Sequence, residues 1–188
     1  MFNISTRSSR RIDKEELIKI LKEVDIKLER KIKLTAIGGT ALNILGLKQT
    51  TQDIDFIIED SDPLIKADII TTIYKQGVET QLQDPGTIVI YKLPKDYRKK
   101  SLEDKELNKN FTKINIKILT PIDIIITKLN RFEPKDITDI TNILNNTKYD
   151  LKIIEKRFKQ YYNLFPGNKQ KLMNHFIQFK ELYNKIYQ

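Results

Sequence analysis

The sequence predicts an α/β (α+β) fold in which a mixed sheet flanked by helices extends to about residue 119 and a helical segment occupies residues 120–188. Two observations support this prediction. Before residue 120, several short stretches are continuously apolar or alternate between apolar and polar residues, as strands do. After residue 120, apolar residues recur every three or four positions, as they do on one face of a helix. We therefore expect a core over residues 1–119 and a C-terminal helical region packed on it.

The first part of the chain alternates helices with strands. Residues 12–30 have apolar side chains at helical spacing, and "KIKLTAI" and "DIDFII" predict strands at 31–37 and 53–58. A short helix, "TALNIL", lies between these strands, and Asp62-Pro63 and Gly77 mark the two ends of the next helix. Three further strands are expected, at residues 86–93 and 111–119 and, more weakly, at 78–83. The polar stretch over residues 94–110 predicts a surface loop with a helical turn.

Helix-start signals dominate the second part of the chain. Thr120 is placed as an N-cap, Pro121 follows at the first helical position, and Asp123 takes the capping-box position. Further helices are expected over residues 133–146, 150–165 and 168–187. The aromatic residues of this segment predict packing between helices, with stacking on RNA bases as the alternative. They are Tyr161, Tyr162, Phe165, Phe176, Phe179, Tyr183 and Tyr187.

Composition favours some functional classes and excludes others. A hydrophobic content of 39% and a charged content of 31% indicate a soluble globular protein. There is no apolar run of the roughly 18 residues that span a membrane, no secretory signal and no cysteine, so a cytoplasmic location and no membrane partner are expected. The single histidine, His175, excludes a histidine-based metal site or catalytic triad. The net charge of +9 indicates either an acidic partner, nucleic acid first, or a biased composition.

Gly38-Gly39-Thr40 follows the first predicted strand and begins a short helix. Main-chain N–H groups at a helix N-terminus bind anions, glycine allows a phosphate to approach the backbone, and the Thr40 hydroxyl adds a donor. A tight turn without ligand is the alternative, because glycine is common in turns. The motif predicts a phosphate site only together with its neighbours.

Asp53 and Asp55 lie on one face of the predicted strand over residues 53–58, about 6.5–7 Å apart along the chain. Two neighbouring carboxylates repel each other unless a cation lies between them, and such oxygen pairs suit a Mg²⁺ ion that also contacts substrate phosphates. The alternative is that both acids are solvated at the start of the strand.

"GGTALNILGLKQTTQDIDF" resembles the nucleotidyltransferases of the polymerase-beta-like superfamily, and more narrowly the AbiEii-type enzymes, several of which are toxins of toxin–antitoxin pairs. Lys48 stands where those families commonly have arginine. The resemblance implies transfer of a nucleoside monophosphate from an NTP to an acceptor, with two Mg²⁺ ions held by Asp53 and Asp55. It also implies a nucleotide site that includes Gly38, Gly39, Thr40 and Lys48. RNA such as tRNA and a cognate antitoxin are the further partners that it implies.

A second block, "LTPIDIIITKLNRFEPKDITDI", resembles the segment of the same families in which one helix carries a lysine and the next begins with D-x-x-D. By this resemblance Lys128 contacts the nucleotide phosphates, and Asp136 or Asp139 completes the active site. Asp136 has a structural alternative, because it is the third residue of a helix that begins at Pro134, where carboxylates are stabilising.

The third carboxylate of the site is left open. Many members of the superfamily place it on a later strand, where "KINIKIL" offers Asn115, and an amide binds Mg²⁺ less well than a carboxylate does. Either Asp136 or Asp139 supplies this acid, or the protein is a catalytically degenerate module that binds nucleotide or RNA. For RNA, the expected contacts are Arg7, Arg10, Arg11, Arg98, Lys99 and Lys100.

Overall fold

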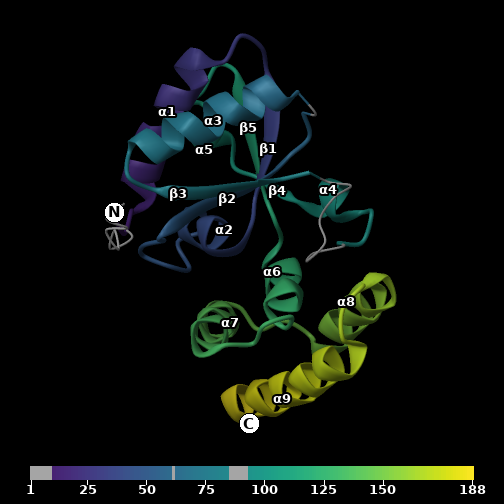
Figure 1. The fold of residues 1–188 in the computed structure, drawn as a ribbon. Coiled ribbons are helices and arrows are strands. Elements are labelled where there is room, and N and C mark those ends of the chain that lie inside the picture. The colour runs from purple at the N-terminus through teal and green to yellow at the C-terminus, as the bar shows by residue number, and fades with distance from the viewer. Residues whose placement is uncertain (1–9, 61, 85–92) are drawn as a thin grey trace, which may run out of the picture.

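A mixed five-stranded sheet forms the centre of the molecule (Figure 1). The computed structural model describes residues 10–60, 62–84 and 93–188. The strands are β1 (Ile32–Ala36), β2 (Asp53–Ile58), β3 (Glu79–Gln83), β4 (Leu102–Glu103) and β5 (Ile114–Ile118), in the order β3-β2-β1-β5-β4. β1 runs parallel to β5 and β2 parallel to β3, whereas β1 with β2 and β4 with β5 are antiparallel. The α/β prediction with a mixed sheet is therefore confirmed.

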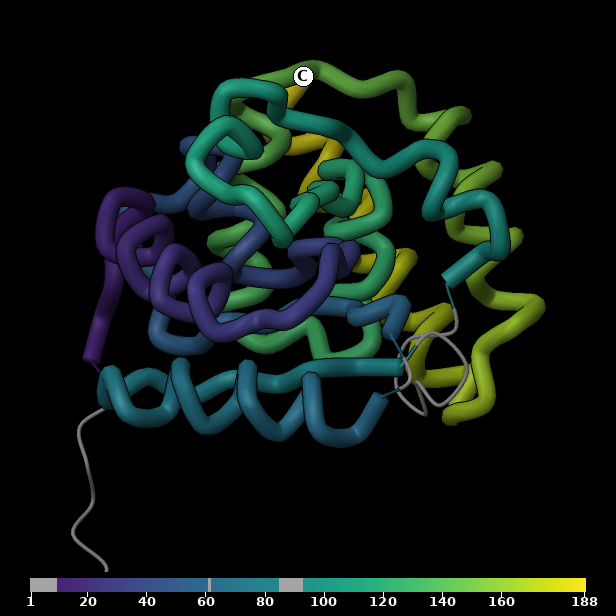
Figure 2. The backbone as a smooth tube through the Cα atoms, turned by 90° about the horizontal axis from the view of Figure 1, so that it is seen from above, coloured from purple at the N-terminus to yellow at the C-terminus, as the bar shows by residue number. Residues whose placement is uncertain are grey.

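Helices cover both faces of this sheet (Figures 1 and 2). Figure 2, seen from above, shows α1 and α3 in front of the sheet and the green and yellow C-terminal helices behind it. The helices of the core are α1 (Lys14–Lys27), α2 (Gly38–Ile44), α3 (Pro63–Lys75), α4 (Tyr97–Lys100) and α5 (Lys105–Asn108). Those of the C-terminal segment are α6 (Pro121–Lys128), α7 (Pro134–Asn146), α8 (Leu151–Leu164) and α9 (Lys169–Tyr187).

One of the remaining predicted strands is confirmed and the other is not tested. The weakly predicted strand at 78–83 is present as β3, at the edge of the sheet beside β2. The strand predicted at 86–93 lies, apart from its last residue, outside the described residues. The polar stretch over residues 94–110 contains the helical turns α4 and α5 and also the two-residue strand β4, which is too short to leave a periodic pattern.

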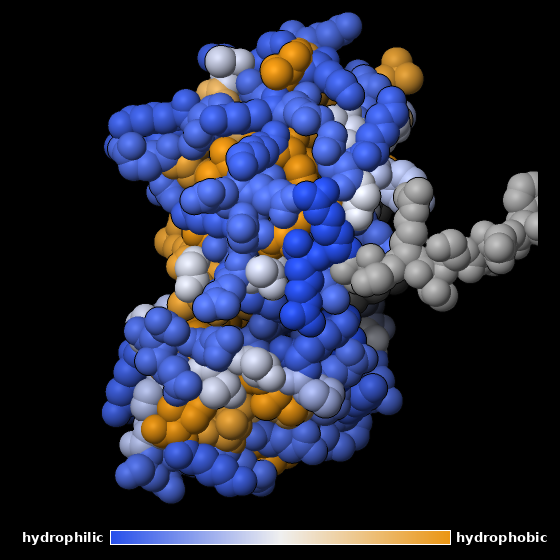
Figure 3. Space-filling model, turned by 90° about the vertical axis from the view of Figure 1, so that its left-hand side faces the viewer, coloured by the Kyte–Doolittle hydropathy of each residue, from blue (hydrophilic) through white to orange (hydrophobic). Residues whose placement is uncertain are grey.

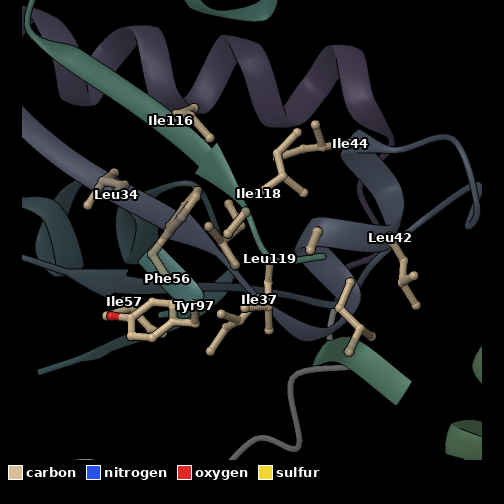
Figure 4. Close-up of a cluster of buried hydrophobic side chains, with 14 of the residues drawn as sticks. Leu34, Ile37, Leu42, Ile44, Phe56, Ile57, Tyr97, Ile116, Ile118 and Leu119 are labelled. Carbon is tan, nitrogen blue, oxygen red and sulfur yellow. The ribbon is translucent and has the colours of Figure 1, made fainter. Parts of the chain in front are cut away.

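The core explains why Asp53 and Asp55 face away from it. Ile54, Phe56 and Ile58 are fully buried on one face of β2, so the alternation of a strand directs the residues between them to the opposite face. That opposite face carries α2, and the C-terminal helices lie on the same side of the sheet, with α6 against α2 (Figure 1). Figure 4 shows the buried cluster where the strands end, including Phe56 on β2 and Ile116 and Ile118 on β5.

Arg157 attaches the C-terminal segment to the core. It lies on α8, is 5% exposed, and donates to both carboxylate oxygens of Asp123 on α6 at 2.5 and 3.1 Å. Its Nη1 also donates to Asp96, at 2.5 Å, just before α4. Hydrogen bonds from Arg157 and Lys100 lower the pKa of Asp96 to about 2. Because breaking one side of a buried pair leaves a charge without compensation, this link fixes α8 against the core.

The aromatic residues of the C-terminal segment pack between its helices, as predicted. Tyr161 and Phe179 are fully buried, and the rings of Phe158 and Phe176 stack 3.8 Å apart between α8 and α9. This packing leaves these four rings no face for RNA bases. Figure 3 shows apolar side chains gathered in the lower part of one face of the molecule, at the level of these helices. None of the helices in the described part of the chain combines the length and the apolar character that a membrane crossing requires.

Candidate active site

The two carboxylates on β2 differ in their surroundings. Asp53 is exposed, and its Oδ1 accepts a hydrogen bond from the Thr51 hydroxyl at 3.2 Å. Asp55 is partly buried, and its Oδ1 is inaccessible to solvent and has no hydrogen-bond partner. A buried carboxylate oxygen without a partner is costly, so this atom marks a place where a donor or a cation is missing.

The pKa of Asp55 also indicates that its negative charge lacks a compensating partner. Burial, together with the neighbouring charge of Asp53, raises this pKa to about 7, and a hydrogen bond from the Gln81 main chain and the charge of Lys128 only partly offset the rise. A cation between the two carboxylates would reverse both effects. Oxygen donors of this kind fit Mg²⁺, which is commonly held by one or two carboxylates together with substrate phosphates.

Gly38 and Gly39 bring the main chain against both aspartates. Gly38 has φ +53°, a conformation that side chains disfavour, and a Cβ there would lie 4.0 Å from Asp55 Oδ2. At Gly39 the restriction is space, because a Cβ would lie 2.7 Å from Thr51 Oγ1 and 3.8 Å from Asp53 Oδ1. Any phosphate held by these N–H groups therefore lies next to the two carboxylates.

Thr40 has a structural role that the sequence did not reveal. It is fully buried, and its hydroxyl donates to the main-chain oxygen of Asp53 at 3.2 Å and accepts from the N–H of Asp55 at 2.9 Å. The hydroxyl proton is therefore used within the protein, so Thr40 fixes α2 to β2 and is not a phosphate donor in this geometry. The phosphate contacts expected at this turn are therefore those of the main chain at Gly38 and Gly39.

Gly39→Ala should lower nucleotide affinity at least tenfold, because the new methyl group fills the space through which a phosphate reaches the main chain. The clash with Thr51 should also cost about 1–3 kcal/mol of stability. In the double variant Gly39→Ala/Thr51→Ala the clash is relieved, so stability should recover while nucleotide affinity, measured by calorimetry, stays low. Affinity in the double variant equal to that of Thr51→Ala alone would contradict this reading.

Three cations and two buried carboxylates form a continuous chain opposite the β2 aspartates. Lys128 Nζ lies 3.1 Å from Asp136 Oδ1 and 2.6 Å from Asp139 Oδ2. Lys48 Nζ lies 3.1 Å from Asp139 Oδ1, and Arg131 donates to both oxygens of Asp136 at 2.9 Å. The two acids are only 1% and 3% exposed, so they are held almost entirely by these cations.

This arrangement changes the expected role of Asp136 and Asp139. Burial raises the pKa of Asp136, but hydrogen bonds from Arg131 and the charge of Lys128 outweigh it and hold the pKa below its usual value. Asp136 also forms a capping box with Glu133, which confirms the structural alternative derived from its position in the helix. Among the residues that the structure describes, no three histidine, cysteine or acidic side chains are grouped to hold a metal. The ion pairs hold the side chains of Lys48, Lys128 and Arg131 in place, and the completion of the active site by one of the two acids stays a prediction.

The turn that carries Lys128 and Arg131 is held by the last helix. Phe132 has φ +53°, an uncommon conformation for a residue other than glycine. Its ring stacks on His175 of α9, with ring centroids 5.4 Å apart, and His175 Nδ1 lies 2.6 Å from the carbonyl oxygen of Leu129. Because a carbonyl only accepts, Nδ1 carries the proton. His175 is thus a structural residue that supports the cationic turn.

Asn115 is not the neighbour of the aspartates. It lies on β5 opposite Lys33, and β1 separates β5 from β2. β2 lies between β1 and β3, and on β3 Gln81 is the direct partner of Asp55. The residue beside Asp55 on β3 is therefore Gln81, which the sequence does not reveal because the pattern of residues 78–83 predicts only a weak strand and gives no pairing.

A cleft of about 880 Å³ joins these groups. Eight of the nine site residues predicted from the sequence line it, and Thr40 does not. The eight are Gly38, Gly39, Lys48, Asp53, Asp55, Lys128, Asp136 and Asp139. The cleft thus has a carboxylate pair that fits a divalent cation, a glycine turn beside it and cations that can neutralise phosphates.

Comparison with protein families identifies a family whose model matches most of the chain. The family described as "Nucleotidyltransferase of unknown function (DUF6036)" matches residues 15–186. No curated protein and no solved structure matches the chain. The narrower resemblance to AbiEii-type enzymes stays a prediction. Because the match covers most of the chain, the protein belongs to this family of nucleotidyltransferases of unknown function.

Proposed function

We propose that the protein is a Mg²⁺-dependent enzyme that transfers a nucleoside monophosphate from an NTP to an acceptor hydroxyl. The observation that carries this proposal is the buried Oδ1 of Asp55, which lacks a partner and lies on the same strand face as Asp53. Asp53 and Asp55 would hold the metal, with two ions expected for this chemistry. When bound, Mg²⁺ would neutralise phosphate charge and favour the ionised acceptor hydroxyl.

The remaining residues bind and orient the nucleotide. The main chain at Gly38 and Gly39 would receive phosphate oxygens beside the carboxylates. Lys48, Lys128 and Arg131 would offset the charge of the triphosphate, and the pairing of these cations with Asp136 and Asp139 fixes them before substrate arrives. Such preorganised charge lowers the reorganisation that the transition state requires.

The direct test uses NTPs labelled at the α-phosphate, incubated with total RNA and with protein, in the presence and absence of Mg²⁺. We expect label in the acceptor only with Mg²⁺, and none with Asp55→Asn. If none of the four NTPs gives labelled acceptor in the presence of Mg²⁺, the catalytic proposal fails.

RNA is the acceptor that we propose, with tRNA the first candidate by the family resemblance and a toxin role as the corresponding biological setting. The charge of +9 supports an acidic macromolecule. Among the predicted contacts, Arg11 lines the cleft, whereas Arg10 pairs with Glu16, and Arg7 lies outside the described residues. On α4 Lys99 is exposed, Arg98 lies 3.5 Å from Glu59 and Lys100 lies 2.8 Å from Asp96.

RNA affinity should fall steeply with salt. Contacts to roughly three or four phosphates would give a log–log slope near −3. Neutralising Arg98, Lys99 and Lys100 together should weaken RNA binding and reduce this slope without changing NTP affinity. No RNA binding at low salt, or transfer of label to protein hydroxyls instead, would overturn the RNA proposal and leave the catalytic one standing. Suppression of growth on induced expression, relieved by Asp55→Asn, would support the toxin role and the existence of an antitoxin.

A second candidate is a non-catalytic nucleotide-binding module. The observation that favours it is Gln81 beside Asp55, where a further carboxylate would strengthen the metal site. If the wild type binds NTP without transferring it and Gln81→Glu transfers it, this second candidate is correct.

A further inference from the structure

The two ends of the cleft differ in chemistry. At one end lie the cations Lys48, Lys128 and Arg131. At the other end the cleft face of β2 continues from Asp55 to Ile57, which is 1% exposed. Four further apolar side chains line the cleft: Leu47 beside Lys48, Leu93, and the pair Ile37 and Leu119, which lie level with Asp55 because the N–H of Ile37 donates to Asp55 O at 3.2 Å. Ile37 and Leu119 are adjacent at the ends of β1 and β5, since the N–H of Leu119 donates to Ala36 O at 3.0 Å (Figure 4).

Gln83 is the polar exception at this apolar end. It lies on β3 as the direct partner of Ile57, two residues beyond Gln81, and both glutamines line the cleft. The Oε1 atom of Gln83 is buried and has no hydrogen-bond partner. A side-chain amide oxygen is an acceptor, so a ligand that fills this end must bring a donor to satisfy it.

The position of Gln83 relative to the carboxylates suits a nucleotide. Adjacent strands lie about 4.8 Å apart and a two-residue step advances about 6.6 Å, so the Cα atoms of Asp55 and Gln83 are separated by about 8 Å. With the α-phosphate at the carboxylates, the ribose covers this interval and the base reaches the apolar end. Ligand sites of this kind are mostly apolar, with a few polar groups that fix orientation.

We propose that the apolar end of the cleft is a nucleobase site and that Gln83 selects the base. The inference rests on the proposed function, because the position of the base follows from a triphosphate bound at the two carboxylates. The unsatisfied oxygen of Gln83 is complementary to an exocyclic amine, which adenine and cytosine carry where guanine and uracil have a keto oxygen. Guanine and uracil present their donors at other ring positions, so an amine at this position makes ATP or CTP the proposed substrate class.

The test is calorimetric binding of the four NTPs as non-hydrolysable α,β-methylene analogues with Mg²⁺. We expect the wild type to bind the ATP and CTP analogues about tenfold more tightly than the others, the effect of one good hydrogen bond. Gln83→Leu should abolish this preference, whereas Gln83→Glu, which keeps only acceptors, should retain it. Gln49→Leu, at another cleft-lining glutamine, is the matched control and should leave the preference unchanged.

The outcomes separate this inference from the function on which it rests. Equal affinity for the four analogues, or an unchanged preference in Gln83→Leu, would overturn the base site alone. A preference for the GTP and UTP analogues would overturn the assignment of an amine donor. If none of the analogues binds in the presence of Mg²⁺, the proposed function and the base site both fail. Melting temperatures of both Gln83 variants confirm that the folded protein is being compared.

Discussion

Asp55→Asn is expected to abolish nucleotide transfer, by at least a hundredfold, while making the metal-free protein more stable at pH 8. Activity is lost because a neutral amide holds Mg²⁺ poorly and leaves the triphosphate without its counter-charge. Stability is gained because the substitution removes a buried charge that repels Asp53 and has an oxygen without a partner. A substitution that lowers activity and raises stability is typical of a residue whose role is to bind a ligand.

The pH dependence follows from the raised pKa of Asp55. Folding favours the protonated carboxyl, so the contribution of Asp55 to stability is fully present below the ordinary pKa of 3.8 and is lost as the pH rises through about 7. The loss is of the order of 4 kcal/mol, taking about 1.4 kcal/mol per pKa unit. Asp55→Asn should therefore match the wild type near pH 4 and exceed its free energy of unfolding by a few kcal/mol at pH 8.

Denaturant unfolding in a chelator at the two pH values measures this difference. Asp68→Asn, which removes an exposed carboxylate on α3, is the matched control for the change of net charge and should show no such pH dependence. A destabilised Asp55→Asn protein at pH 8, or one that retains full activity, would contradict the assignment of Asp55 to a metal site.

Lys128→Met is expected to lower both activity and stability. The ammonium group is shared by Asp136 and Asp139, so its loss leaves two buried carboxylates with one cationic partner each, Arg131 and Lys48 respectively. Breaking a buried pair of this kind costs about 3 kcal/mol. Removing a preorganised positive group from the phosphate site should lower the rate by about 10²–10³.

A double variant separates the two effects of Lys128. In the single variant, Asp139 loses Lys128, the nearer of its two cations. Lys128→Met/Asp139→Asn also removes the charge of Asp139, so most of the lost stability should return in thermal unfolding. Activity should remain low, because the phosphate charge is still not offset. If the double variant recovers activity together with stability, Lys128 is only a structural residue.

The parts of the fold that the sequence predicts are those with local causes. Pro121 and Pro134 start helices because their fixed φ and missing N–H suit the first turn, and the structure has helices beginning at both. The alternation in "DIDFII" likewise directs both aspartates away from the core without reference to any distant residue. Such signals are carried by a few adjacent positions, so a single sequence contains them.

The parts that could not be predicted depend on pairing between distant segments. Lys48 and Asp139 are 91 positions apart, and their contact requires α7 to lie over the loop that follows α2. In the same way, Gln81 becomes the neighbour of Asp55 only because β3 pairs with β2. The sequence pattern instead suggests Asn115, on β5, as the residue at the strand position of the third carboxylate. The role of Thr40 was hidden for a similar reason, since both partners of its hydroxyl are main-chain atoms of β2.

The central claim is that Asp53 and Asp55 hold a divalent cation together with an NTP. Calorimetric titration of Mg²⁺ into metal-free protein mixed with the α,β-methylene analogue of ATP or CTP, with the heat of Mg²⁺ binding to the analogue alone subtracted, tests it most directly. We expect metal binding that depends on the nucleotide and disappears in both Asp53→Asn and Asp55→Asn. Nucleotide binding that is unaffected by a chelator, or metal binding that persists in both variants, would contradict the claim.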